Sequence, residues 1–127
     1  EVEDTAEIGI RFDNGVLSST HLDFVQRAPE HTLKIVGSKG TIQWNNADGF
    51  ATCYDAEADA LTQSVLPEGF ERNTLFLAET RNFLDVARGI ASPACTLEDG
   101  IAAVRMAEAV HRSALTGASI KLIDGLE

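Results

Sequence analysis

The chain of 127 residues is long enough for one compact domain and too short for two of ordinary size. Its 44% hydrophobic and 24% charged residues are typical of a globular protein and not of a disordered chain. Ten basic residues against 20 acidic ones give a net charge of -10, which argues against a nucleic-acid or anionic-membrane surface. No apolar run reaches the roughly 20 residues that cross a bilayer.

The ends of the sequence indicate a piece of a longer protein. It begins with Glu1, its one methionine is Met106, and its start lacks the basic and apolar segments of a secretory signal. We therefore expect residues 1–125 to be one domain that continues from an upstream segment. Leu126-Glu127 is either the remnant of a purification tag or native sequence.

The two cysteines indicate neither a metal site nor a disulfide framework. Cys53 and Cys95 lie far apart, and neither belongs to a Cys-x-x-Cys pair. In a reducing compartment such residues pack as small apolar side chains, so we expect both to be buried and the protein to be cytoplasmic. A single bridge between them stays open as an alternative.

The first part of the chain has the alternating pattern of β-strands. Apolar and polar residues alternate over 5–12, and Asn14-Gly15 follows as a strong hairpin signal, because both residues tolerate positive φ. The return strand is expected over 16–24. A two-residue loop would place Ile8 opposite His21, whereas a longer loop would shift that register by one.

Four more strands are predicted before the pattern changes. Segments 33–36 and 41–44 form a second hairpin around Gly37-Ser38-Lys39-Gly40, whose glycines let the chain turn without a steric clash. Weaker strand patterns cover 50–54 and 61–66.

The second part of the chain has a helical period. Residues 74–87 carry an apolar stripe, with Asn73 as the expected N-cap. Thr96-x-x-Asp99 is a variant of the capping box, and it begins a second helix that is expected to end at Gly117.

These elements, with a last strand over 119–123, predict an α+β fold. We expect an open, mainly antiparallel or mixed sheet of about six strands with two helices packed on one face. The other face must be solvated or must meet another surface. The small polar residues 18–20 are expected there, with Arg27 and Arg72 beside them.

His21 and Asp23 are the clearest candidates for chemistry, because residues two apart on a strand point to the same face. A carboxylate could orient the imidazole for general base catalysis, which would suit a small hydrolase that is active alone. A polar pair on a half-solvated strand is also common without any catalytic role, and we favour this structural interpretation. No nucleophile or zinc motif accompanies the pair.

Two other polar segments are best explained by structure. Asp55, Glu57 and Asp59 alternate without the spacing of a calcium loop, so we expect a solvated edge and no metal site. Segment 37–41 lacks the spacing of a phosphate loop and enters a strand, so a plain hairpin is expected. No Gly-x-Gly-x-x-Gly follows a strand and opens a helix, so the usual dinucleotide cradle is missing.

The order of the motifs is more specific than any one of them. In chain order they are Val2-Glu3-Asp4-Thr5-Ala6, Asn14-Gly15, Ile35-Val36-Gly37-x-x-Gly40-Thr41-Ile42, Glu79-x-x-x-Phe83-Leu84, Thr96-Leu97-Glu98-Asp99-Gly100 and Ser113-x-x-x-Gly117. From Val2 to about Leu122 this run resembles the C-terminal domain of the glucose-fructose oxidoreductase / inositol dehydrogenase family (Gfo/Idh/MocA). His21-Leu22-Asp23-Phe24 with Gln26-Arg27 looks most like members found with bacterial surface-sugar synthesis.

The resemblance implies half of a two-domain enzyme. In this family an N-terminal Rossmann domain holds NAD or NADP, and the C-terminal domain forms the subunit interface and one wall of a sugar or cyclitol pocket. The family's catalytic Lys lies in a Glu-Lys-Pro motif, which is absent here. The resemblance therefore implies no catalytic or cofactor-binding residue in this chain. On its own the chain should have no catalytic activity.

The main hypothesis is the C-terminal domain of an NAD(P)-dependent oxidoreductase acting on a sugar, nucleotide-sugar or cyclitol. The domain is expected to form a homo-oligomer through its open sheet face, with His21, Asp23 and Arg27 lining the substrate pocket or the subunit interface. The alternative is a non-enzymatic dimerisation or scaffold module, whose natural neighbour would carry no cofactor site.

Overall fold

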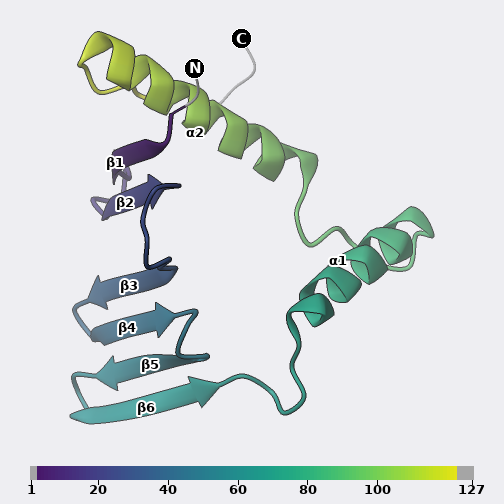
Figure 1. Ribbon diagram of the computed structural model, residues 1–127. Helices are drawn as coiled ribbons and strands as arrows, with labels where there is room; N and C mark the ends of the chain where they lie inside the picture. The colour runs from purple at the N-terminus through teal and green to yellow at the C-terminus, as the bar shows by residue number, and fades with distance from the viewer. Residues whose placement is uncertain (1–2, 123–127) are drawn as a thin grey trace. The chain divides into compact units, whose positions relative to one another are not determined.

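The computed structural model describes residues 3–122, which form six strands and two helices (Figure 1). The strands belong to one compact unit, which ends at Phe70, and the helices belong to a second unit, which begins at Glu71. The predicted α+β class is confirmed. All strand pairs are antiparallel, and the six strands divide between two sheets instead of forming one.

Strands β1 (Thr5–Arg11) and β2 (Leu17–Asp23) form a two-stranded sheet. The Phe12 N–H donates to the Val16 carbonyl at 2.9 Å, and the Gly15 N–H donates to the Phe12 carbonyl at 2.9 Å. The loop therefore has three residues and ends on Gly15 at φ 87°, a conformation that glycine adopts without a Cβ clash. The two-residue loop considered above is wrong, and the longer-loop register is confirmed.

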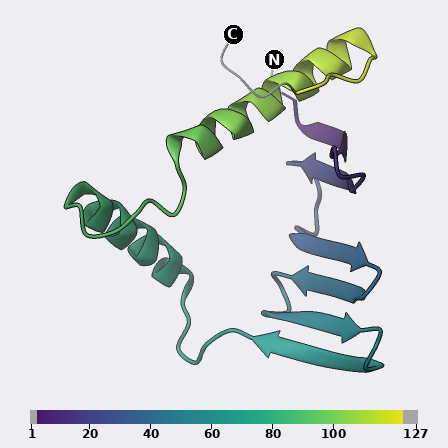
Figure 2. The same ribbon diagram turned by 180° about the vertical axis from the view of Figure 1, so that it is seen from behind.

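Four strands form the second sheet in the order β3-β4-β5-β6 (Figure 2). Their bounds are β3 (Thr32–Gly37), β4 (Gly40–Asn45), β5 (Phe50–Asp55) and β6 (Ala60–Val65). The predicted hairpin around Ser38-Lys39 is confirmed, because Gly37 pairs with Gly40 across a two-residue loop. Each strand is joined to the next by a short turn, so the sheet is a simple meander.

The register gives this sheet two different faces. Residues that pair directly share a face, so one face is mainly apolar and the other mixes polar and apolar side chains. The apolar face carries Leu33, Ile35, Ile42, Trp44, Ala51 and Cys53. The mixed face carries Thr32, Lys34, Gln43, Asn45, Thr52 and Gln63 together with Val36, Phe50, Tyr54, Leu61 and Val65.

The acidic loop between β5 and β6 is a turn held by its own side chains. Asp55 Oδ1 accepts the backbone N–H groups of Glu57 at 2.8 Å and Ala58 at 3.0 Å, and Asp59 accepts the Tyr54 hydroxyl at 2.8 Å. Asp59 adopts a φ of 47°, which Asp tolerates better than most residues. The carboxylates of Asp55 and Asp59 therefore stabilise a turn.

The second unit contains α1 (Arg72–Ala87) and α2 (Leu97–Thr116). The N-cap predicted at Asn73 is wrong, because Glu71 is the extended residue before the helix and the Thr74 hydroxyl accepts its N–H at 3.4 Å. The capping box of α2 is confirmed, with Asp99 N–H donating to Thr96 Oγ1 at 3.2 Å and Thr96 N–H to Asp99 Oδ2 at 2.8 Å. Gly117 ends α2 at φ 67°.

Two other expectations are corrected. Residues 119–122 form no strand, because the described part of their own unit contains two helices and no strand to pair with. Ile123 lies outside the described residues, as do Leu126-Glu127. Cys53 and Cys95 are free and exposed instead of buried, because Cys53 lies on a face that is open within its own unit and Cys95 in the connection before α2.

Neither helix of the described chain is long and apolar enough to span a membrane.

Candidate functional site

The candidate site is a cluster of three ionisable side chains on the β1–β2 hairpin. Glu7 pairs directly with His21 in the ladder, and Asp23 lies two residues further along β2. Side chains alternate along a strand, so all three lie on the same face of the hairpin. The cluster is a direct product of the three-residue loop, which sets this register.

His21 contacts a carboxylate at each ring nitrogen. Its Nδ1 lies 2.5 Å from Glu7 Oε1, and its Nε2 lies 2.8 Å from Asp23 Oδ2. The Asp23 side chain is only 8% exposed, and its other oxygen accepts the backbone N–H groups of Val25 at 3.0 Å and Gln26 at 2.6 Å. Asp23 is therefore fixed by the turn that follows β2, and it fixes His21 in turn.

These contacts change the pKa values of two members of the cluster. The hydrogen bond to Glu7 raises the pKa of His21 most, and the hydrogen bond to Asp23 raises it further. The backbone N–H of Gln26 lowers the pKa of Asp23 most, followed by the hydrogen bond from His21. Both shifts favour the charged forms, a protonated imidazole beside an ionised carboxylate.

The structure joins His21 and Asp23, as the sequence suggests, but it keeps Arg27 apart from them. Arg27 is exposed in the segment between β2 and β3, next to the Gln26 side chain, whose Nε2 donates to the Ala28 carbonyl at 2.7 Å. Within residues 3–122 no hydrogen bond or ion pair joins Arg27 to the cluster.

Glu7 is the member of the cluster that the sequence analysis missed. Its place opposite His21 depends on the length of the loop between β1 and β2. Asn14-Gly15 is compatible with both loop lengths that were considered, and the longer one brings Glu7 to His21. Assigning Gly15 as the third loop residue would have found Glu7 from the sequence.

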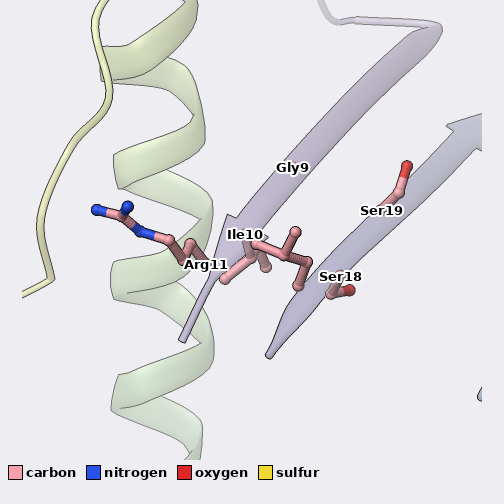
Figure 3. Close-up of a pocket in the computed structure, with 6 residues that line it drawn as sticks. Gly9, Ile10, Arg11, Ser18 and Ser19 are labelled. Atoms are coloured by element: carbon pink, nitrogen blue, oxygen red, sulfur yellow. The ribbon is translucent and has the colours of Figure 1, made fainter. Parts of the chain in front are cut away.

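An open hollow lies on the hairpin beside Gly9 (Figure 3). It is lined by Gly9, Ile10, Arg11, Leu17, Ser18 and Ser19. Gly9 pairs with Ser19 and has no side chain that could fill the hollow. The Arg11 side chain extends away from β2 (Figure 3). A second hollow lies over the mixed face of the four-stranded sheet, next to Lys34 and Gln43. Neither hollow includes His21, Asp23 or Arg27.

Metal ions and dinucleotides have specific requirements for the acidic and histidine side chains and for the starts of the helices that bind them. No group of three or more His, Cys, Asp or Glu residues in this part of the chain could hold a metal. The first turn of α2 carries Glu98 and Asp99, whose charges oppose the binding of a pyrophosphate at that helix end. No glycine-rich turn precedes either helix in residues 3–122.

Comparison with known proteins identifies the family. The family described as "Oxidoreductase family, C-terminal alpha/beta domain" (GFO_IDH_MocA_C) has a model that matches residues 1–122, nearly the whole chain. The chain belongs to the Gfo/Idh/MocA family. It corresponds to the C-terminal domain of these oxidoreductases, as the order of motifs indicates.

A curated relative of this Gfo/Idh/MocA domain is a 1,5-anhydro-D-fructose reductase from Ensifer adhaerens. The two are 28% identical over 130 residues, which cover 98% of this chain and 37% of the relative. The chain therefore spans little more than a third of the length of that protein. No solved structure matches the chain.

Proposed function

We propose that this chain is the substrate-binding and subunit-pairing domain of an NAD(P)-dependent oxidoreductase that acts on a sugar, nucleotide-sugar or cyclitol. The observation that carries the proposal is the match of the family's C-terminal domain to residues 1–122. The name of the Ensifer adhaerens relative, a reductase of an anhydro-sugar, supports a sugar-like substrate.

The chemistry of hydride transfer would come from a nicotinamide cofactor held outside this chain. The acidic first turn of α2, whose charges oppose a pyrophosphate at that helix end, supports this division. His21, Asp23 and Arg27 would then contribute binding, not proton transfer to the reacting atoms. Hydroxyl-rich ligands are bound by such charged and hydrogen-bonding groups.

An assay of the full-length protein tests the proposal. We expect oxidation of NADH or NADPH in the presence of keto-sugars or anhydro-sugars, and the reverse reaction with polyols or cyclitols. The isolated 127-residue chain should show no turnover with the same reagents. Absence of any nicotinamide-dependent turnover by the full-length protein would instead favour the non-enzymatic pairing module.

Arg27→Ala tests the role of the segment between β2 and β3. Loss of a charged hydrogen-bond donor from a binding site costs about 1.5–3 kcal/mol, so we expect the KM for the sugar to rise by roughly ten- to a hundredfold with little change in kcat. Lys39→Ala is the matched control, because it removes the same charge from the exposed β3–β4 turn. Unchanged KM and unchanged dimerisation in Arg27→Ala would contradict the assignment of Arg27.

A further inference from the structure

His21 stands between two carboxylates, and this arrangement determines how many protons the cluster holds. An ionised carboxylate only accepts hydrogen bonds, and a neutral imidazole has a single N–H donor. Both contacts of His21 can therefore be hydrogen bonds at the same time only if the cluster holds one additional proton. That proton belongs on the imidazole, because a carboxylic acid is about two pKa units more acidic than imidazolium.

The two carboxylates are held very differently. Asp23 keeps two backbone hydrogen bonds and is 8% exposed, whereas Glu7 is 69% exposed and its carboxylate contacts only His21 among the described residues. Deprotonated His21 can keep one of its two contacts. The proton stays on Nε2, which continues to donate to the fixed Asp23. The unprotonated Nδ1 then faces the Glu7 carboxylate, and because both groups are hydrogen-bond acceptors, they repel each other.

We propose that Glu7, His21 and Asp23 form a proton-dependent clasp, in which protonated His21 joins β1 to the turn after β2 and loss of its proton releases Glu7. The clasp adds a side-chain attachment that depends on one proton to the backbone ladder at this end of the hairpin. It stands on the geometry of residues 5–26 and does not depend on the proposed function.

The charged groups that face His21 within the hairpin are few. β1 is the element that packs against β2, and its residues on this face are Thr5, Glu7, Gly9 and Arg11. Along β2 the same face carries Leu17, Ser19 and Asp23. Arg11 is the one other charged residue in this group, and it lies four residues from Glu7, opposite Leu17. The two carboxylates are therefore the charges in contact with the imidazole.

Nuclear magnetic resonance of the full-length protein with ¹⁵N-labelled histidine tests the clasp, with His21→Asn to assign the resonances. We expect both ring nitrogens of His21 to be protonated at the acidic end of the titration. At the basic end the proton should leave Nδ1 and stay on Nε2. In Glu7→Gln the amide can donate to Nδ1, so the neutral imidazole is satisfied and the titration midpoint of His21 should move to lower pH.

Glu57→Gln is the matched control, because it removes an exposed carboxylate from the β5–β6 turn and should leave the midpoint of His21 unchanged. Asp23→Asn should also lower the midpoint, and if this variant fails to fold, Glu7→Gln decides, because the Glu7 side chain is exposed. The clasp is overturned if Glu7→Gln leaves the midpoint where it was, or if the neutral imidazole carries its proton on Nδ1.

Discussion

His21 and Asp23 make the stability of the protein depend on pH in two opposite ways. The raised pKa of His21 contributes stability that is present below its ordinary value of 6.5 and is lost as the pH rises through the folded value. The lowered pKa of Asp23 contributes stability that is present above 3.8 and is lost as the pH falls through its folded value. We expect the contribution of the cluster to be greatest between these two limits.

Urea unfolding of the full-length protein at a series of pH values measures this dependence. His21→Gln should flatten the loss of stability above pH 6.5, because the residue that gains a proton on folding is gone. His31→Gln is the control, since the His31 ring contacts Trp44 edge-on at 4.8 Å and no carboxylate of the cluster. An equal effect of both substitutions would argue against the assignment to His21.

Single residues also show why part of the site could not be predicted. His21 and Asp23 share a face because of the strand period alone, and the sequence reveals that much. The backbone hydrogen bonds that fix Asp23 come from Val25 and Gln26, and they depend on a turn whose conformation has no clear sequence signal. The role suggested for Arg27 stays a prediction.

At the scale of the elements, the turn between β3 and β4 depends on a glycine. A Cβ at Gly40 would lie 2.0 Å from the carbonyl oxygen of Tyr54 on β5, and backbone on both sides of this contact is held in the ladder. We expect Gly40→Ala to lower the free energy of unfolding by about 2 kcal/mol or more. Gly9→Ala is the matched control, because nothing lies within 4 Å of its Cβ position. Urea unfolding that gave equal losses for the two variants would contradict this expectation.

The start of α2 depends on the Thr96 hydroxyl, which accepts the N–H of Asp99 and donates to its carboxylate. Thr96→Ala removes this cap, and we expect a loss of about 1 kcal/mol in the free energy of unfolding. Thr96→Ser keeps a hydroxyl at the same place and should recover most of the loss. Thermal unfolding monitored by circular dichroism compares the three proteins, and a Ser variant as unstable as the Ala variant would indicate another cause.

The elements were predictable where a local signal is unambiguous. The Thr96 capping box and Gly117 bound α2 in sequence and in structure, because caps act within a few residues. The start of α1 was misplaced because Asn73 is a better N-cap by type than Glu71, which the chain uses. The division of the strands into two sheets depends on pairing between distant segments, which alternation does not specify.

At the scale of the whole molecule, the four-stranded sheet has an apolar face whose side chains are exposed to solvent within their own unit. Leu33, Ile35 and Ile42 are 41–52% exposed within their own unit, and each apolar Å² removed from water stabilises a protein by about 25 cal/mol. The sequence predicts helices on one face of the sheet. We therefore expect this face to be covered in the full-length protein.

The reactivity of the Cys53 thiol measures whether the apolar face is accessible to solvent, because Cys53 pairs with Ile42 on that face. We expect alkylation of Cys53 in the native full-length protein to be at least ten times slower than in urea, by peptide mass spectrometry. Cys95, in the connection before α2, should react faster than Cys53 in the native protein. Equal native rates for the two thiols would show that the face is open to solvent.

The three-residue loop at the tip of the first hairpin constrains which changes of loop length the cluster tolerates. The same sequence closed on the two-residue loop Asn14-Gly15 would place Ile8 opposite His21 and leave Glu7 on the other face, although no residue had changed. An insertion or deletion in the loop therefore preserves the cluster only if Phe12 still pairs with Val16.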